Sequence, residues 1–337
     1  MAAQELTVPL TESLEIADAF AQAASRLGER DEHLTIAGVR VRLRFAGDAL
    51  HTRLLPALAH RITAPQPSDV SILLYDCASA NVTPAVPWRA EDVGVRGEIA
   101  VDSSMRVSLF APSGALSVFD PKQSLGIFAV RDAAMLPSYE VAAPLRTLLH
   151  WILETRDCKL VHAAAVATWH GGALLAGRGG SGKSTTALLC ADAGFAYAGD
   201  DYVALSTNPT RAHALYATAK ITATSAAMLP QLALQFAPDA NEKGVALLHN
   251  VAESFDVRTL ILPRVVGGTS QLRRASGAEA LRALAPTTVF QLPGNDGAAF
   301  AWIAAIARTL PAFALDLGDD RENIPSLVAR AIEESRA

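Results

Sequence analysis

Eight consecutive residues near the middle of the chain, 177–184, read G-R-G-G-S-G-K-S and match the pattern G-x-x-x-x-G-K-[S/T]. The glycines allow a loop to curl so that its backbone N–H groups point at phosphate oxygens. Lys183 adds a positive charge, and the hydroxyl group of Ser184 is a ligand for Mg²⁺. A helix that begins here also directs the positive end of its dipole at the anion. The pattern therefore predicts a phosphate-binding loop between a strand and a helix.

The residues on either side have the order that such a loop needs. Residues 173–176 are a short apolar run typical of a buried strand, and residues 184–194 predict a helix that ends at Gly194. We therefore expect residues 177–185 to bind a purine nucleoside triphosphate, ATP, with Mg²⁺. A glycine-rich turn with an incidental lysine is the alternative. The residues expected to hold the nucleotide are Gly177, Gly179, Gly180, Ser181, Gly182, Lys183, Ser184 and Thr185.

Two adjacent acids, Asp200 and Asp201, interrupt an apolar strand just beyond this helix. A phosphoryl-transfer site needs carboxylates that hold Mg²⁺ and accept a proton from the acceptor hydroxyl. Neighbouring residues of an extended strand point to opposite faces, so both acids act in one site only at a twist or a strand end. Gly199 favours such an irregularity. A plain turn is the alternative interpretation of these residues.

Segment 160–206, which contains the loop and the acid pair, resembles the catalytic domain of the HPr kinase/phosphorylase family. In that family a strand that carries a histidine leads through a short hairpin to the phosphate-binding loop, and an Asp-Asp pair follows the helix. His162, residues 177–184 and the two acids are the matching positions. The resemblance implies an α/β fold akin to phosphoenolpyruvate carboxykinase and a P-loop kinase that uses ATP and Mg²⁺. From the residues alone, His162 is also open to interpretation as a satisfied core histidine.

The resemblance further implies a role for each residue of the site. Asp200 is the base that deprotonates the acceptor hydroxyl, and Asp201 with Ser184 holds Mg²⁺, although the two neighbouring acids could exchange roles. Lys183 neutralises the β- and γ-phosphates. His162 lies near the same phosphates and shapes the charge around the acid pair. We therefore expect a serine kinase, a phosphotransferase with an alcohol acceptor.

Two further charged residues match a divergent branch of the same family. No segment like the family's H-x-x-E-I-R-G signature follows the acid pair, so neither HPr as substrate nor phosphorylase activity is implied. Residues 215–222 and 260–266 are instead similar to HPr-kinase-like proteins of bacterial biosynthetic clusters, which include kinases of lasso-peptide precursors. Lys220 and Arg264 are the matching charged positions, and the resemblance implies contact with phosphate or an acidic substrate. Solvated charges at strand ends are the alternative.

The identity of the acceptor is not encoded in any motif of the chain. We expect a hydroxyl group of a protein or peptide, including a ribosomally made peptide precursor, and a small hydroxylated metabolite is the alternative. A third hypothesis is that the protein is a non-catalytic regulator that only binds nucleotide. The acid pair argues against the regulator, because a protein that only binds nucleotide has no need of both carboxylates.

The first part of the chain has a different pattern. We expect a β-rich domain over residues 1–135 and the kinase-like domain over 136–337, because an apolar helix face begins beyond Pro137. The first domain holds no acid, nucleophile or metal constellation, so we expect a mostly antiparallel unit that recognises the acceptor or forms a homo-oligomer interface. Its strands are expected at 34–46, 70–76, 97–102, 105–111 and 115–120. In the first of these, alternating arginines indicate a solvated strand face, with an anion site as the alternative.

The second domain has further local signals beyond the acid pair. Gly267 and Gly268 predict a hairpin that joins strands on either side of them. Ser276 and Glu279 predict a capping box before a helix that ends near Pro286. A late strand over 313–317 and a final helix with proline in its first turn complete the domain.

Composition restricts the partners and the compartment. The formal net charge of −5 argues against a nucleic-acid partner. The longest apolar run, 298–315, contains an arginine and a proline, so we expect no membrane span. Three scattered cysteines and the lack of a signal-peptide pattern predict a cytoplasmic protein.

Overall fold

The computed structural model places two compact units along the chain, Met1–Arg156 and Asp157–Ala337. The described residues are 11–83, 90–101, 104–110, 112–237, 243–289, 292–293 and 297–335. The sequence places the boundary earlier, at 135/136. The helix that we assigned to the second domain, α5 (Arg146–Glu154), belongs to the first unit. Its Leu148 packs over Gly126 on a strand of that unit, because the apolar helix face needs a sheet to cover.

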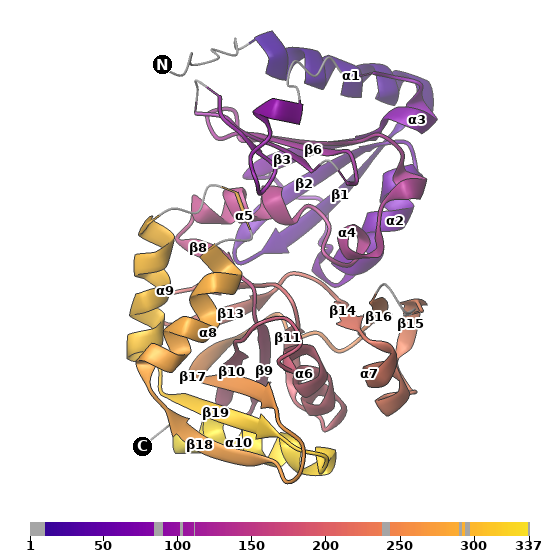
Figure 1. The fold of residues 1–337 in the computed structure, drawn as a ribbon. Helices are drawn as coiled ribbons and strands as arrows, with labels where there is room; N and C mark the ends of the chain where they lie inside the picture. The colour runs from indigo at the N-terminus through magenta and orange to yellow at the C-terminus, as the bar shows by residue number, and fades with distance from the viewer. Residues whose placement is uncertain are drawn as a thin grey trace. The chain divides into compact units, whose positions relative to one another are not determined.

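The first unit is built on a seven-stranded mixed sheet in the order β1-β2-β3-β7-β6-β5-β4 (Figure 1). The central pairs β2–β3 and β3–β7 are parallel, and the other pairs are antiparallel. The strands are β1 (Glu29–Ile36), β2 (Val39–Ala46), β3 (Val70–Asp76), β4 (Glu98–Ile99), β5 (Arg106–Phe110), β6 (Ala115–Asp120) and β7 (Leu125–Val130). The ends of two predicted strands, Asp102 and Ala111, lie outside the described residues.

The prediction of one strand over 34–46 is wrong. Ala37 and Gly38 both have positive φ angles, of 48° and 79°, and they turn the chain between β1 and β2. A two-residue turn with this backbone matches the twist of an antiparallel hairpin. The alternating arginines of β2 lie half-buried in ion pairs. Arg40 pairs with Asp69, Arg42 with Asp31, and Arg44 with Glu29.

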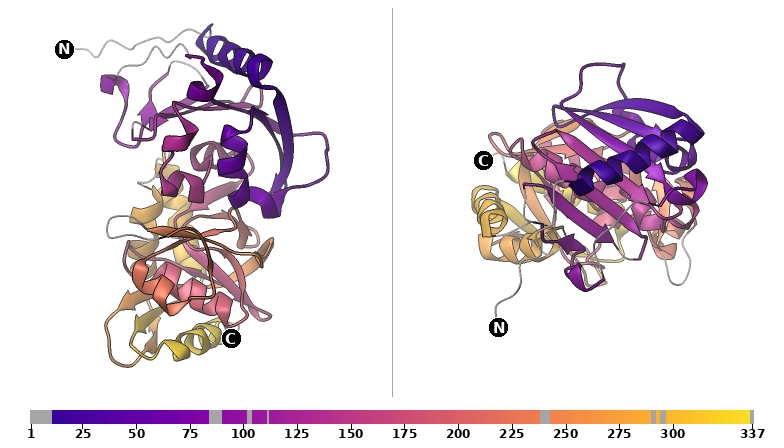
Figure 2. Two further views of the ribbon diagram at one scale, coloured as in Figure 1. Left: turned by 90° about the vertical axis from the view of Figure 1, so that its right-hand side faces the viewer. Right: turned by 90° about the horizontal axis from the view of Figure 1, so that it is seen from above.

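Helices cover both faces of this sheet. The helix α1 (Thr11–Leu27) was not predicted, although Ile16, Phe20 and Ala23 recur at helical spacing and are buried. It lies across one face of the sheet (Figures 1 and 2) and packs on β2 and β3. Its apolar stripe thus excludes water from that face. The other helices of the unit are α2 (Ala49–Leu58), α3 (Cys77–Ala80), α4 (Ser138–Ala142) and α5.

The second unit is built on a nine-stranded sheet and a separate three-stranded sheet. The larger sheet consists of β8 (Cys158–Val161), β9 (Ala164–Thr168), β10 (Gly171–Leu175), β11 (Ala196–Gly199), β12 (Val203–Ser206), β13 (Arg211–Ala214), β17 (Ser254–Val265), β18 (Gln271–Ala275) and β19 (Ala312–Leu317). The smaller sheet consists of β14 (Thr218–Ile221), β15 (Ala233–Phe236) and β16 (Gly244–Leu247). The chain is therefore a mixed α/β protein, as its sequence predicts.

Helices cover both faces of the larger sheet (Figures 1 and 2), and an apolar core lies beneath them on each face. One core lies between the sheet and the pair α8 (Gly277–Val289) and α9 (Gly297–Thr309). The other lies between the sheet and the pair α6 (Lys183–Asp192) and α10 (Ile324–Glu334). The short helix α7 (Ala223–Met228) follows β14. No helix in the described ranges is both long and apolar enough to cross a membrane.

Long-range pairing overturns one local prediction in this unit. Gly267 and Gly268 do not join a hairpin, because β19 lies between β17 and β18 and pairs with both of them. The predicted capping box is present: the Glu279 N–H donates to the Ser276 hydroxyl, and the Ser276 N–H donates to the Glu279 carboxylate. The helix that it begins continues past Pro286 to Val289.

Candidate functional site

The glycine-rich loop joins the end of β10 to the first turn of α6. Gly180 and Gly182 have φ angles of 81° and 99°, a backbone region that favours glycine. A Cβ atom on Gly182 would lie 2.3 Å from Cδ1 of Leu317. The loop therefore needs glycine at this position both for its backbone and for its packing. With Gly182 as N-cap, α6 directs its first N–H groups at the loop.

Lys183 lies buried within the curve of this loop. Its Nζ donates to the carbonyl oxygens of Gly177 and Arg178, at 2.6 and 3.2 Å. Burial lowers the pKa of this lysine, while the charges of Asp201 and Asp200 act in the opposite direction. The loop thus holds an ammonium group at its centre, with both carboxylates close enough to act on its charge.

The acid pair occupies the bend between β11 and β12. Gly199 has a φ angle of 155°, and the register of β11 against β9 shifts between Tyr197 and Gly199. A Cβ atom on Gly199 would lie 2.8 Å from Cγ1 of Val203 and 2.9 Å from the carbonyl oxygen of Tyr202. The backbone is therefore irregular at Gly199. This irregularity allows adjacent aspartates to join one network.

Asp200 is buried and bound mainly by neutral groups. The hydroxyl of Tyr197 donates to Oδ1 at 3.3 Å, and the backbone N–H of Lys220 donates to Oδ2 at 3.2 Å. Burial and the neighbouring charge of Asp201 raise the pKa of Asp200 to about 6. A hydrogen bond from Ser184 and the charge of Lys220 offset only part of this shift. Asp200 therefore lies against the first turn of α6, and its pKa of about 6 is above that of an ordinary aspartate.

Asp201 is bound by groups that are cationic or can become so. Nε2 of His162 lies 2.9 Å from Oδ1, and Nζ of Lys220 lies 2.8 Å from Oδ2. Burial acts to raise the pKa of Asp201, but the hydrogen bond from His162 and the charge of Lys220 outweigh it and hold the pKa well below its usual range. The His162 ring packs against Tyr202, with ring centroids 5.4 Å apart. Asp201 is therefore a fixed, ionised carboxylate.

The predicted residues fall into two groups in the structure. The network joins His162, Lys183, Ser184, the two acids and Lys220. Thr185 turns away from it, and its hydroxyl lies 2.8 Å from the hydroxyl of Ser225 in α7.

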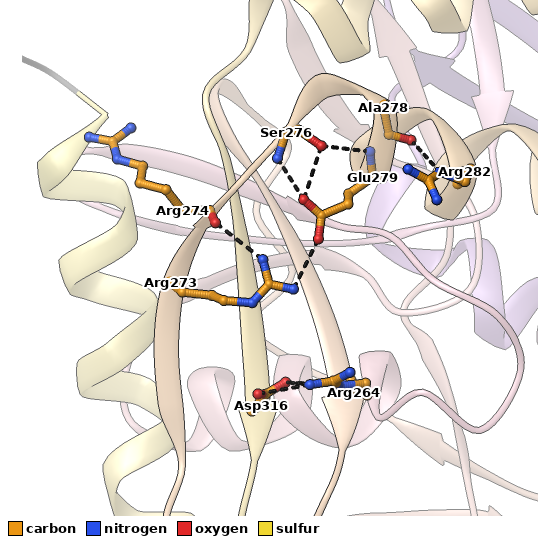
Figure 3. Close-up of polar contacts among 8 residues, drawn as sticks. All are labelled: Arg264, Arg273, Arg274, Ser276, Ala278, Glu279, Arg282 and Asp316. Atoms are coloured by element: carbon orange, nitrogen blue, oxygen red, sulfur yellow. Dashed lines mark hydrogen bonds and ion pairs between the residues drawn. The ribbon is translucent and has the colours of Figure 1, made fainter.

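Arg264 lies outside this network. It forms a two-pronged ion pair with Asp316 on β19, at 3.0 Å for each bond (Figure 3). Side chains alternate along β17, so Val265 faces Gly182 of the loop while Arg264 lies on the opposite face of the sheet, with α8 and α9. Among the described contacts, none joins Arg264 to either acid of the pair. The structure therefore does not bring Arg264 together with the other residues of this site.

Sequence reasoning missed two contributors to the site. Tyr197 reads as an ordinary apolar strand residue, yet its buried hydroxyl donates to Asp200 and to the carbonyl oxygen of Thr218. Lys243, an exposed residue just before β16, lowers the pKa of Lys183 through its charge. Both come from segments that only the tertiary fold brings to the loop. The one local signal was the position of Tyr197 two residues before Gly199.

The donor set fits Mg²⁺ delivered with a nucleotide. The hydroxyl of Ser184 and the carboxylate of Asp201 are hard oxygen ligands of the kind that Mg²⁺ prefers. Within the described residues, no group of three or more His, Cys, Asp and Glu side chains could hold a metal by itself. Mg²⁺ in proteins commonly takes one or two carboxylates and completes its shell with water and phosphate oxygens. These residues therefore suit a metal that arrives with phosphate.

Comparison with known proteins adds a weak likeness to solved structures. No protein-family model matches the chain, and no curated protein matches it either. Among solved structures the chain is similar to the Hpr(Ser) kinase/phosphatase from Coxiella burnetii, with 13% sequence identity and a TM-score of 0.30. The alignment covers 53% of this chain and 96% of that chain. A likeness of this size carries no argument about function, so the interpretation of the site rests on its own geometry.

Proposed function

We propose that this protein is an ATP-dependent kinase that transfers the γ-phosphoryl group to a serine-type hydroxyl of a protein or peptide. The observation that carries the proposal is the meeting of three elements in the second unit. The glycine-rich loop with its buried Lys183 lies beside a bend that brings in two carboxylates, and Lys220 of β14 binds both of them. A loop that only bound phosphate would gain nothing from two desolvated carboxylates beside it.

The loop and the first turn of α6 suit the nucleotide. Backbone N–H groups of the loop would bind phosphate oxygens, and Lys183 would leave the Gly177 carbonyl to neutralise the β- and γ-phosphates. Ser184 and Asp201 would hold Mg²⁺, which would supply positive charge to neutralise the phosphate groups. His162 would keep Asp201 oriented and ionised.

Asp200 suits the role of base. It accepts hydrogen bonds from neutral groups and has no cationic side chain within bonding distance among the described contacts, whereas Asp201 is held by Lys220. In phosphoryl transfer the base positions the attacking hydroxyl and takes its proton as the bond to phosphorus forms. A carboxylate with a pKa close to 6 holds that proton better than a fully ionised one.

The proposal is tested by replacing the loop lysine. Lys183→Ala should remove charge from the β- and γ-phosphates, lower affinity for MgATP and reduce phosphate transfer by roughly a hundredfold or more. The measurements are binding of a fluorescent ATP analogue and transfer from radiolabelled ATP to peptides that contain serine. Lys122→Ala, an exposed lysine of the first unit, is the matched control and should behave as wild type.

Two results would overturn the proposal. One is unchanged affinity and transfer in Lys183→Ala. The other is tight MgATP binding by the wild type with no transfer to any peptide, protein or small hydroxylated acceptor, which would favour a nucleotide-binding regulator instead.

A further inference from the structure

Lys220 binds both members of the acid pair, each through a different group. Its backbone N–H donates to Oδ2 of Asp200 at 3.2 Å, and its Nζ lies 2.8 Å from Oδ2 of Asp201. The backbone of β14 is fixed from both sides, because Lys220 also pairs with Val245 on β16. The side chain, by contrast, is a flexible four-carbon stem. The ammonium group can therefore move while the strand stays in place.

Both acids of the site already have ammonium groups close to them. Asp200 and Asp201 contribute two acidic groups, and Lys183 and Lys220 contribute two ammonium groups close to them. The Lys220 and Asp201 side chains are only 19% and 21% exposed. A carboxylate as sheltered as Asp201 is strongly destabilised when no cation is near it. A metal that binds Asp201 through Oδ2 therefore takes the place of the Lys220 ammonium group.

We propose that Lys220 is the resident counter-cation of Asp201, and that its ammonium group leaves Asp201 for the transferred phosphoryl oxygens when a divalent cation binds with the nucleotide. The inference rests on the proposed function and adds an exchange of ion partners to it. No covalent bond forms or breaks in this exchange, and no proton moves. Asp201 exchanges one cation for another, and Lys220 exchanges one set of anionic oxygens for another.

The exchange has two consequences, one for metal binding and one for catalysis. Without nucleotide, the ammonium group of Lys220 competes with divalent cations at Asp201, so the metal binds well only when phosphate oxygens are present to accept the lysine. With nucleotide, Lys220 becomes a catalytic residue that faces the charge developing on the phosphoryl group, alongside Lys183. The same side chain thus couples metal binding to nucleotide binding.

The experiment measures binding of Mn²⁺ alone to the nucleotide-free full-length protein, by electron paramagnetic resonance of free Mn²⁺. We expect Lys220→Gln to bind Mn²⁺ about tenfold more tightly than wild type, because it removes the competing charge. Adding Asp201→Asn to this variant should abolish the gain. Lys220→Arg keeps a cation on Asp201 and should show no gain. In a second arm, Lys220→Gln should reduce kcat by roughly a hundredfold while KM for MnATP changes little.

The matched control is Lys122→Gln, which removes the same charge at an exposed position of the first unit. The described contacts include no ion pair between Lys122 and either acid of the pair. It should leave Mn²⁺ binding close to that of wild type. Equal Mn²⁺ affinity in wild type and Lys220→Gln overturns the inference, as does an equal gain in Lys122→Gln. The Mn²⁺ arm does not depend on turnover, so a chain with no kinase activity would overturn the proposed function and leave only the role of Lys220 as counter-cation of Asp201 standing. Thermal unfolding checks that each variant is folded, and Lys220→Met replaces Lys220→Gln if the latter is not.

Discussion

At the scale of single residues, the site gives two neighbouring aspartates different surroundings and therefore different pKa values. Asp200 accepts hydrogen bonds from a tyrosine hydroxyl and a backbone N–H, whereas Asp201 accepts them from a histidine and a lysine. Because their surroundings differ, the pKa of Asp200 lies near 6 and the pKa of Asp201 lies far below it. When the pKa values of two carboxylates differ in this way, one can accept a proton while the other stays ionised and binds a cation.

Asp200→Asn should retain affinity for ATP and lose phosphate transfer by roughly two orders of magnitude, because a base that takes a proton in the transition state is removed. In the wild type, transfer should fall as the pH drops below about 6, where Asp200 becomes protonated. Asp201→Asn is the comparison: it should raise the Mg²⁺ concentration needed for half-maximal rate. Steady-state rates between pH 5 and pH 8 check both variants, and a wild-type rate in Asp200→Asn contradicts the assignment.

Asp200→Asn should also stabilise the fold at neutral pH. The folded state holds the Asp200 proton up to about pH 6, whereas an unfolded aspartate releases it near pH 4. The contribution of this group to stability is therefore fully present below pH 4 and is lost as the pH rises to about 6. At pH 7 the loss amounts to at most about 3 kcal/mol. Thermal unfolding of the variant should occur at a higher temperature than that of wild type at pH 7, but not at pH 4. The exposed Glu322→Gln should show no such pH-dependent gain.

At the scale of elements, the loop and the acid bend depend on close approaches that only glycine allows. Gly182 packs under Leu317 of β19, and Gly199 packs against Val203 of β12. Each glycine therefore ties its local turn to a strand of the larger sheet. Tyr197 adds a third tie, because its buried hydroxyl joins Asp200 to the edge of β14.

Gly182→Ala should lower the free energy of unfolding of the second unit by roughly 2 kcal/mol or more, because the new methyl group combines a left-handed backbone with a collision against Leu317. It should also weaken ATP binding, since the first turn of α6 would shift. Gly179→Ala is the control within the same loop: its φ angle is not positive and a Cβ there would meet nothing within 4 Å. Chemical denaturation and ATP titration compare the two. An equal free energy of unfolding in both variants would contradict the prediction, because it would show that the close packing at Gly182 does not contribute to stability.

At the scale of the whole molecule, each unit has its own sheet and its own apolar core. Every residue of the candidate site belongs to the second unit, Asp157–Ala337. The first unit contributes no group to the acid and lysine network among the described contacts. The role predicted for it from its strand pattern, recognition of an acceptor or of a second copy, stays a prediction.

Residues 157–337 expressed alone should therefore fold and bind MgATP with an affinity close to that of the full chain. Circular dichroism and ATP titration of this fragment check the expectation. Transfer to the natural acceptor should fall while turnover with a short serine peptide is kept, if the first unit recognises the acceptor. A folded fragment that has lost all nucleotide binding would contradict this division of labour.

Much of the local structure was accessible from the sequence. The strand before the glycine-rich loop, the helix after it and the capping box at Ser276 depend on residues close together in the chain. These elements are set by backbone preferences and short-range hydrogen bonds, so they can be predicted without the tertiary fold. The unpredicted turn at Ala37 and Gly38 was missed because the alternation of side chains continues on both sides of it.

The sequence by itself determined that a glycine-rich loop, a lysine and two adjacent acids are present and in which order. Only the tertiary structure decided which side chains meet. Lys220 reaches Asp201 because β14 lies beside the acid bend, and Arg264 faces Asp316 because β17 pairs in register with β19. Strand register and side-chain alternation set these partners, and both follow from burial of apolar faces over long stretches of chain. A charged residue shows its type in the sequence, but its partner depends on the strand that packs against it.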